Sequence, residues 1–319
     1  MPISPIPGRT TAPIPSSTLK GYLAEPAATN LCLQSNAFTT TWTQNSVTSN
    51  TQNAAGPDGA TSAWTIVDGS AVASSSISQA ITLTAAAYTL SVFIKKTTGA
   101  QSAYPILFWY VLAGTLELQA CTVDTSNGIA TDWTAYTGAG SMAAGRSVRI
   151  ESYNSSYWRV SLTKTGTAAA HQVELLPSGT TNPVQSSGTK DVAAQGSAVF
   201  YGAQVELGSF ATSYIPTTTV AVTRNGEIDS LPTSGNILAA AGTIALTFTP
   251  THTPSGTIAL WGTYVDASNY TAILHDATNL IFRKRIAGVN YDATIANAFT
   301  SGTTYKMAAS WGSGGSTIY

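Results

Sequence analysis

Aromatic side chains are the residues of this sequence best suited to bind a ligand. Pyranose rings stack their C–H faces on exposed aromatic rings, and nearby amides and hydroxyls hydrogen-bond the sugar hydroxyls, so charge is not required. The chain has seven Trp and fourteen Tyr. Four of them are candidate glycan-binding residues: Trp109, Tyr110, Trp133 and Tyr136. Trp109 and Tyr110 are adjacent in a strand-like run, so one of them is expected to face water or a partner.

Trp133 and Tyr136 lie in IATDWTAYTGAG, where a strand ends in a glycine-rich loop, and we expect both rings to be exposed. Such a shallow aromatic platform predicts weak binding to a neutral or mildly acidic polysaccharide, with single-site dissociation constants of roughly micromolar to millimolar and little salt dependence. Trp42, Trp64 and Trp158 fall at positions that the pattern assigns to the core.

No set of catalytic residues is marked by its spacing. His171, His252 and His275 occur without an HExxH, GxSxG or paired-His pattern, and we expect them to be solvated strand residues. Glycoside hydrolysis needs two carboxylates held about 5 to 10 Å apart. The 15 acidic residues are scattered mostly singly, so no such pair is indicated and the chain is predicted not to be an enzyme.

Neither a metal nor a cofactor is expected. Cys32 and Cys121 are the only cysteines, too few for a disulfide framework or a metal knuckle, and we expect them to be small buried side chains. Loop oxygens near Asp58 or Asp68 could hold a structural calcium ion, but no dense Asp/Asn loop supports one.

The composition excludes several partners. Only 9% of residues are charged and the net charge is −1, which provides no basic surface for nucleic acid. No apolar run approaches the roughly 20 residues that cross a bilayer, and the N-terminus does not resemble a signal peptide, so membrane insertion is not expected.

The elements that must position these residues are β-strands. Alternation with a period of two places Tyr88, Leu90, Val92 and Ile94 on one strand face, and similar runs recur between turn signals such as GPDG at 56–59. One apolar and one polar face per strand is typical of stacked antiparallel sheets. The predicted fold class is all-β, with almost no helix.

The stretch FYGAQVELGSFATSYIPTTTVAVTR at 200–224 closes the first domain. Alternation in this strand places five residues on one face, opposite Gln204 and Glu206. These five are Val199, Tyr201, Ala203, Val205 and Leu207.

Four segments follow from these patterns. Residues 1–20 are proline-rich and form an extended arm, either a disordered tail or an anchor that docks on another subunit. Residues 21–217 form a jelly-roll-type sandwich, 218–235 a linker that is partly strand, and 236–319 the beginning of a second sandwich. Because Tyr319 falls inside a strand-like run, we expect further strands to follow in a longer natural protein.

Several strings carry a resemblance to a known group of proteins. They are EPAATNLCLQSNAF (25–38), ITLTAAAYTLSVFIKK (81–96), CTVDTSNGIA (121–130), YWRVSLT (157–163) and YGAQVELGSFATSYIPTTTVAVTR (201–224). Together they resemble the carbohydrate-binding-module-like jelly roll of tailed-bacteriophage tail and head appendage proteins, in which a similar closing strand precedes a laminin-G or concanavalin-like sandwich. Residues 236–319 look like the first half of such a sandwich.

The resemblance implies a virion protein, assembled in the bacterial host cytoplasm, and three functions remain open. The first is a fibre or spike protein that binds a host-surface polysaccharide. The second is a structural or decorating protein of the head, neck or collar, whose sandwiches act as spacers. The third is a non-catalytic part of a polysaccharide depolymerase. Phage fibres are usually trimers, so we expect a homo-oligomer, most simply a homotrimer, or attachment to other virion proteins through residues 1–20.

Overall fold

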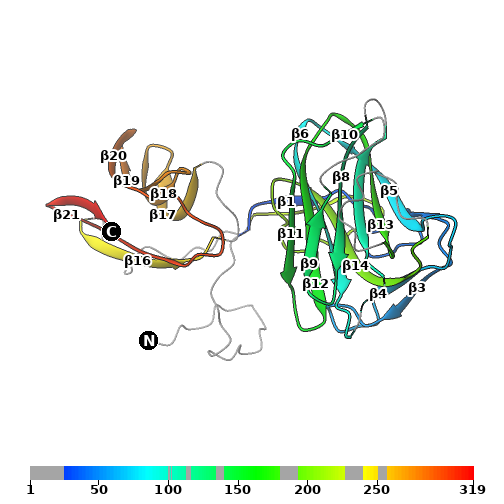
Figure 1. Ribbon diagram of the computed structural model, residues 1–319. Coiled ribbons are helices and arrows are strands. Elements are labelled where there is room, and N and C mark those ends of the chain that lie inside the picture. Colours follow the sequence, from blue (N-terminus) through cyan, green and yellow to red (C-terminus); the bar gives the residue numbers. More distant parts are fainter. Residues whose placement is uncertain are drawn as a thin grey trace. The chain divides into compact units, whose positions relative to one another are not determined.

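The computed structural model describes residues 25–99, 101, 103–112, 116–133, 140–179, 193–226, 240–250 and 257–319. All regular elements in this part of the chain are strands, as the alternating pattern predicts. The chain divides into two compact units, Met1–Ile228 and Asp229–Tyr319, and the division falls within the stretch expected to be a linker (Figure 1). None of the described residues forms a helix that is long and apolar enough to span a membrane.

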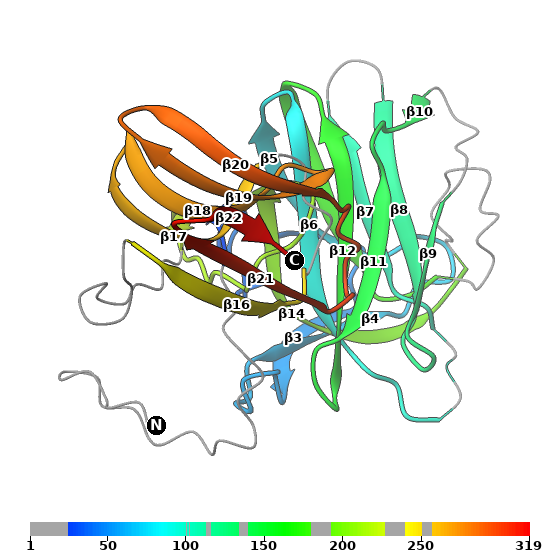
Figure 2. The same cartoon turned by 90° about the vertical axis from the view of Figure 1, so that its left-hand side faces the viewer.

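The first unit contains two large sheets. The first sheet has the spatial order β10 (Gly140–Met142), β8 (Leu116–Asp124), β7 (Ile106–Val111), β13 (Ala169–Leu176), β5 (Ser76–Leu83) and β2 (Thr43–Asn45), with β9 (Ile129–Asp132) paired to β8. The second sheet has the order β11 (Ser147–Ser152), β12 (Tyr157–Gly166), β6 (Ala86–Lys95), β14 (Gly196–Leu207), β4 (Ala63–Asp68) and β3 (Ser49–Ala54). All pairings within these sheets are antiparallel except β8 with β10 (Figure 2).

The main core lies between these two sheets. Leu90, Val92 and Ile94 of β6 are fully buried there, on the face that alternation assigns to them. Trp42 and Trp64 are also buried in this core, and Trp158 is half-buried against it, as the pattern indicates. The two sheets stack as a sandwich because this arrangement removes their facing apolar sides from water.

Strand β14 departs from simple alternation. Its pairing with β6 shifts register between Tyr201 and Gln204, and Gly202 has a φ of 61°. Such a bulge inserts one residue and reverses the faces beyond it. Phe200, Ala203 and Val205 therefore point into the core, whereas Tyr201 points to the outer face of the second sheet.

The prediction of a single apolar face for 199–207 is consequently wrong at Val199 and Tyr201, which pack in a separate cluster outside the main core. Leu207 shares the face of Val205 but is 63% exposed at the end of β14. The glycine at the bulge is the physical reason, because its positive φ is accessible to a residue without a Cβ atom.

Residues 218–226 still belong to the first unit. β15 (Val222–Arg224) pairs antiparallel with β1 (Ala28–Asn30) near the beginning of the described chain. An ion pair between Arg224 and Glu25 extends this contact.

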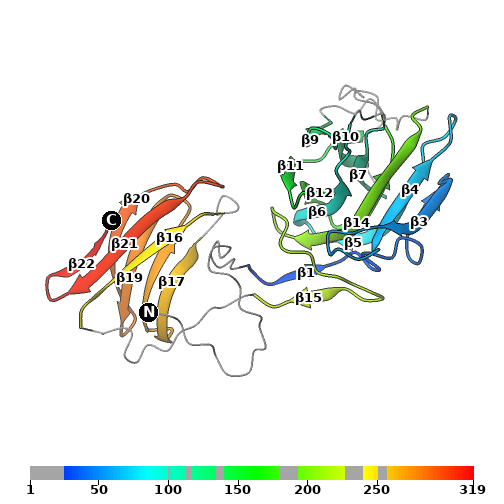
Figure 3. The same ribbon diagram turned by 90° about the horizontal axis from the view of Figure 1, so that it is seen from below.

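The second unit has two smaller antiparallel sheets, visible in Figure 3. One contains β16 (Gly242–Phe248), β21 (Tyr305–Gly312) and β22 (Gly315–Ile318). The other contains β17 (Ile258–Asp266), β18 (Asn269–His275), β19 (Asn279–Ile286) and β20 (Val289–Ala296). Residues from both sheets, including Phe282 and Met307, form its core.

Candidate functional site

The structure buries both tryptophans that were expected to bind glycan. Trp109 is 0% exposed and belongs to the core between the sheets. Trp133 is also 0% exposed, and its Nε1 donates a hydrogen bond to Thr122 Oγ1 at 3.0 Å. The expectation of an exposed Trp133 ring is therefore wrong.

The reason is a second apolar surface on the first sheet. Phe108, Leu118 and Ala120 point away from the main core and would face water if nothing covered them. Trp133 packs over them, with its ring centroid 5.7 Å from that of Phe108. Trp133, the residue directly after β9, thus covers this apolar surface of the sheet.

Tyr110 lies on the face opposite Trp109, as expected, but is half-buried against Phe108. Its hydroxyl donates a hydrogen bond to Glu174 Oε1 at 3.1 Å. Burial, together with the charge of Glu174, raises the pKa of Tyr110 to about 12. Tyr136 lies outside the described residues. None of the three described candidates therefore offers an open ring face.

An aromatic surface of a different composition occurs on the outer face of the second sheet. We call it the Phe93 cluster; it comprises Phe93, Tyr153, Tyr157, Tyr201 and Tyr214. Phe93 is its centre, with ring centroids 4.7 Å from Tyr153, 5.8 Å from Tyr201 and 6.0 Å from Tyr214. Tyr153 is 55% exposed, whereas Phe93 beneath it is 2% exposed.

Local backbone structure positions the exposed ring. Tyr153 follows β11, where the chain turns into β12. The side chain of Asn154 stabilises this turn, because its Oδ1 accepts hydrogen bonds from the backbone N–H groups of Ser156 and Tyr157, each at 2.8 Å. Tyr153 is therefore held at a tight hairpin rather than on a long loop.

The bulge in β14 positions two further rings. Tyr201 lies directly before it and points outward, and at Gly202 a Cβ atom would come within 3.0 Å of the Tyr214 ring. The ring centroids of Tyr201 and Tyr214 are 5.6 Å apart in an edge-on arrangement. Glycine is required here both for its φ and for the close approach of this ring.

A buried arginine lies beside the cluster. The Arg159 guanidinium lies 5.2 Å from the Phe93 ring centroid, and its Nη2 donates to Ser91 Oγ at 2.9 Å. Its Nε is buried and has no hydrogen-bond partner within the described part of the chain. Burial lowers the pKa of Arg159, while Glu206 and other carboxylates act in the opposite direction. A donor without a partner is thus adjacent to the aromatic rings.

The carboxylate of Asp58 also lies next to the cluster. Asp58 Oδ1 accepts a hydrogen bond from Ser62 Oγ at 2.6 Å, and this bond lowers the pKa of the Asp58 carboxyl. Tyr201 Oη lies 3.4 Å from Asp58 Oδ2. Burial and the charge of Asp58 raise the pKa of Tyr201 to about 12.

The conspicuous sequence motif at 201–217 has a structural role next to this surface. Glu206 is fully buried and accepts hydrogen bonds from Gln204 Nε2 at 2.6 Å, Thr212 N at 2.8 Å and Thr212 Oγ1 at 2.7 Å. Gln204 Oε1 accepts from Ile215 N at 2.7 Å. These bonds fold residues 208–217 back against β14 and fix the position of Tyr214.

The groups considered for catalysis or metal binding are engaged elsewhere. His171 and His275 are 0% exposed, so the expectation that they are solvated is wrong; each Nε2 lies about 3 Å from a backbone carbonyl oxygen, of Thr167 and Asn297 respectively. The described residues contain no group of three or more His, Cys, Asp or Glu side chains that could hold a metal ion. His252 lies outside the described residues.

The other side chains considered as metal ligands or nucleophiles are buried or hydrogen-bonded within the fold. Asp68, considered as a calcium ligand, accepts hydrogen bonds from Ser70 N, Ser75 N and Ser178 Oγ. Cys32 and Cys121 are buried and free, and burial raises the pKa of both thiols. Thiols that are held protonated in this way are poor nucleophiles.

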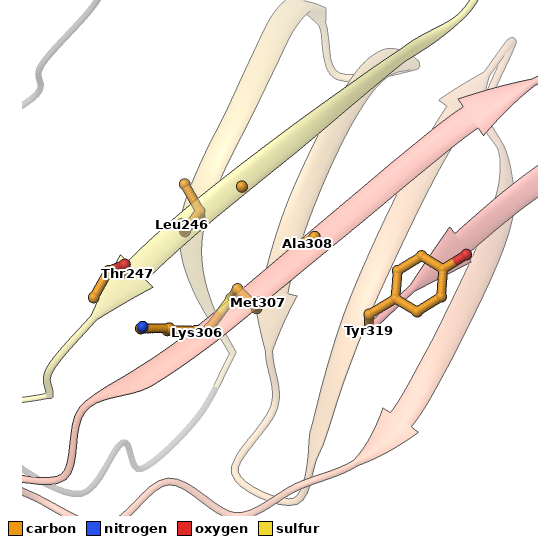
Figure 4. Close-up of a pocket in the computed structure, with 7 residues that line it drawn as sticks. Leu246, Thr247, Lys306, Met307, Ala308 and Tyr319 are labelled. Atoms are coloured by element: carbon orange, nitrogen blue, oxygen red, sulfur yellow. The ribbon is translucent and has the colours of Figure 1, made fainter.

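A shallow hollow of about 390 Å³ occurs on the second unit (Figure 4). Its lining is Ala245, Leu246, Thr247, Lys306, Met307, Ala308 and Tyr319. Lys306 and Tyr319 are the two ionisable side chains in this lining. The hollow therefore lacks the convergent polar groups of a specific site.

The Phe93 cluster is the best candidate site in the first unit. It combines one open ring, a guanidinium, a carboxylate and several hydroxyls, the set that a sugar ring uses for stacking and hydrogen bonding. Four residues at this site, Tyr153, Tyr201, Tyr214 and Arg159, are not among the candidates that the sequence pattern indicates. Tyr153 could have been noticed from the turn signal NSS that follows it.

A comparison with known protein families finds no match for this chain, and a comparison with curated proteins finds no significant similarity.

Proposed function

We propose that this chain is an appendage protein of a tailed-bacteriophage virion that binds host-surface glycans through the Phe93 cluster of its first sandwich. The observation that carries the binding function is the Tyr153 ring, 55% exposed and supported edge-on by Phe93 at 4.7 Å. A rigidly held open ring loses little entropy when a sugar stacks on it. The sequence strings that resemble phage appendage proteins support the virion context.

In this proposal the chain is a binding protein without catalytic activity. Host-surface polysaccharide is its ligand, and other virion proteins are its structural partners. A purely structural role as a spacer is the second candidate. It is favoured by the burial of Trp109 and Trp133, because those rings stabilise the sandwich itself.

Replacing Tyr153 with alanine is expected to weaken binding to bacterial surface polysaccharides at least about tenfold, equivalent to about 1.4 kcal/mol. Tyr153→Phe retains the stacking face and is expected to bind within a few-fold of the wild type. Tyr291→Ala is the matched control, because Tyr291 has a similar exposure of 57% but lies in the second unit. A glycan array followed by isothermal titration measures these affinities.

The spacer role gives a different result. If the full chain binds no polysaccharide from any host surface, or if Tyr153→Ala binds as well as the wild type, the Phe93 cluster is not the binding site. Immunolabelling of intact virions tests the virion context separately.

Deleting residues 1–20 is expected to abolish incorporation into particles while leaving the first sandwich folded, because this proline-rich arm is proposed as the anchor. These residues lie outside the described part of the chain. Quantifying the protein in purified particles, with circular dichroism as the folding control, checks this prediction. Normal incorporation of the truncated chain would exclude the arm as the anchor.

A further inference from the structure

The four-stranded sheet of the second unit carries a row of four polar and aromatic residues. Tyr264, Tyr270, Arg285 and Asn290 are direct cross-strand partners on β17, β18, β19 and β20. Directly paired residues of antiparallel strands point to the same face. Trp261, Ile273 and Phe282 occupy the opposite face and form the core, so the row lies on the outer face.

The two tyrosines form a stacked pair. Their ring centroids are 6.5 Å apart with an interplanar angle of 22°, and Tyr264 is 73% exposed. The next row on this face begins with Gly262 and Ala272, and Ala272 is buried together with Leu274 and Ile281, with Tyr270 packed against them. The open aromatic surface of this face is therefore the Tyr264 ring, with Tyr270 stacked beside it.

Two arginines lie next to these rings, and among the described residues only one of them forms an ion pair. Arg283 forms a two-point ion pair with Asp292, with Nε–Oδ1 at 2.9 Å and Nη2–Oδ2 at 2.7 Å. The Arg285 guanidinium lies 6.0 Å from the Tyr270 ring centroid and has no ion pair among the residues that the structure describes. Its Nε is buried and unpartnered there.

Among the described residues, no carboxylate near these rings forms an ion pair with Arg285. Asp266, the last residue of β17, accepts hydrogen bonds from Ser268 N and from Asn269 Nδ2. Both arginines act on the Tyr270 hydroxyl, and hydrogen bonding from Arg283 is the main cause of its lowered pKa. Within the part of the chain that the structure describes, the Arg285 guanidinium is therefore not paired with a carboxylate.

We propose that this face of the second unit is a binding site for a carboxylate-bearing sugar of an acidic polysaccharide. The sugar ring stacks on Tyr264 and Tyr270, the Arg285 guanidinium pairs with the carboxylate, and the Asn290 amide hydrogen-bonds a hydroxyl. A guanidinium binds a carboxylate through two parallel hydrogen bonds, which a neutral sugar cannot form. This site is separate from the Phe93 cluster and has a different specificity.

Polygalacturonate tests the proposal, and its fully methyl-esterified form is the matched neutral probe. The full-length chain is expected to bind polygalacturonate, with at least tenfold weaker binding of the esterified polymer. Arg285→Gln should reduce polygalacturonate affinity at least tenfold. Arg285→Lys, which keeps the charge but loses the planar donor pair, should be intermediate. Lys284→Gln is the control, since Lys284 is the adjacent residue on the opposite strand face.

Two further variants distinguish binding at this site from binding at the Phe93 cluster. Tyr153→Ala should leave polygalacturonate binding unchanged, whereas Tyr264→Ala should weaken it with no change in thermal unfolding. Equal binding of both polymers, no loss with Arg285→Gln, or an equal loss with Lys284→Gln would overturn the proposal. Tighter binding of a single-stranded oligothymidylate would overturn it in favour of a nucleic-acid site.

Discussion

Glu206→Ala is expected to lower the free energy of unfolding of the first unit by about 3–5 kcal/mol, because it removes the acceptor of a buried hydrogen-bond network. Gln204 Nε2, Thr212 N and Thr212 Oγ1 all donate to this carboxylate. Without it, these donors remain buried and unpaired, and the nearby Arg159 loses a compensating charge. Residues 208–217 should then detach from β14.

Urea or guanidinium unfolding followed by tryptophan fluorescence measures this loss. Glu151→Ala is the control, since Glu151 is on the same sheet but forms an exposed ion pair with Arg149, and exposed pairs contribute about 0–1 kcal/mol. A loss below about 1 kcal/mol for Glu206→Ala would show that the motif at 201–217 is not held by this carboxylate.

Lys164→Met is expected to raise the free energy of unfolding of the first unit by about 1–4 kcal/mol. A stabilisation of this size is unusual for a single substitution. Lys164 is 0% exposed, and its Nζ has no hydrogen-bond partner within the described residues. The Nζ lies 4.9 Å from the Trp109 ring centroid. Among the described residues, three more buried polar atoms without hydrogen-bond partners occur on the core face of the opposite sheet: Trp109 Nε1, Gln119 Oε1 and His171 Nδ1. A cationic group in such surroundings opposes folding, whereas methionine retains the contact with the ring.

The pH dependence of stability provides an independent check on Lys164. Burial lowers its pKa from 10.5 to about 8. Between these two values the unfolded chain binds more protons than the folded chain, so stability rises with pH. The difference in stability between Lys164→Met and the wild type should therefore shrink as the pH increases from 8 to 10.

Differential scanning calorimetry across this pH range measures both effects, with Lys95→Met as the control because Lys95 is exposed on the same sheet. A Lys164→Met variant that is less stable than the wild type at pH 7 would contradict the prediction. It would show that the ammonium group is solvated inside the sandwich by ordered water.

The alternating pattern of the sequence determined the fold class because one apolar face per strand is a local property. It correctly placed Leu90, Val92 and Ile94 in the core. It failed between Tyr201 and Gln204, where a bulge at Gly202 exchanges the two faces. A glycine inside an alternating run was the available signal, since such glycines often mark bulges.

The candidate sites depended on contacts between residues that are distant in the sequence. Whether Trp133 is open or buried depends on Phe108 and Leu118, which lie on neighbouring strands. The Phe93 cluster joins residues from four separate segments, and Arg285 gains its significance from its cross-strand neighbours and from the Arg283–Asp292 pair. Composition and a net charge of −1 are properties of the whole chain, so they do not report which side chains lie next to one another. Only the tertiary structure decided which rings face water and which charges lack a partner, because both depend on what packs against each side chain.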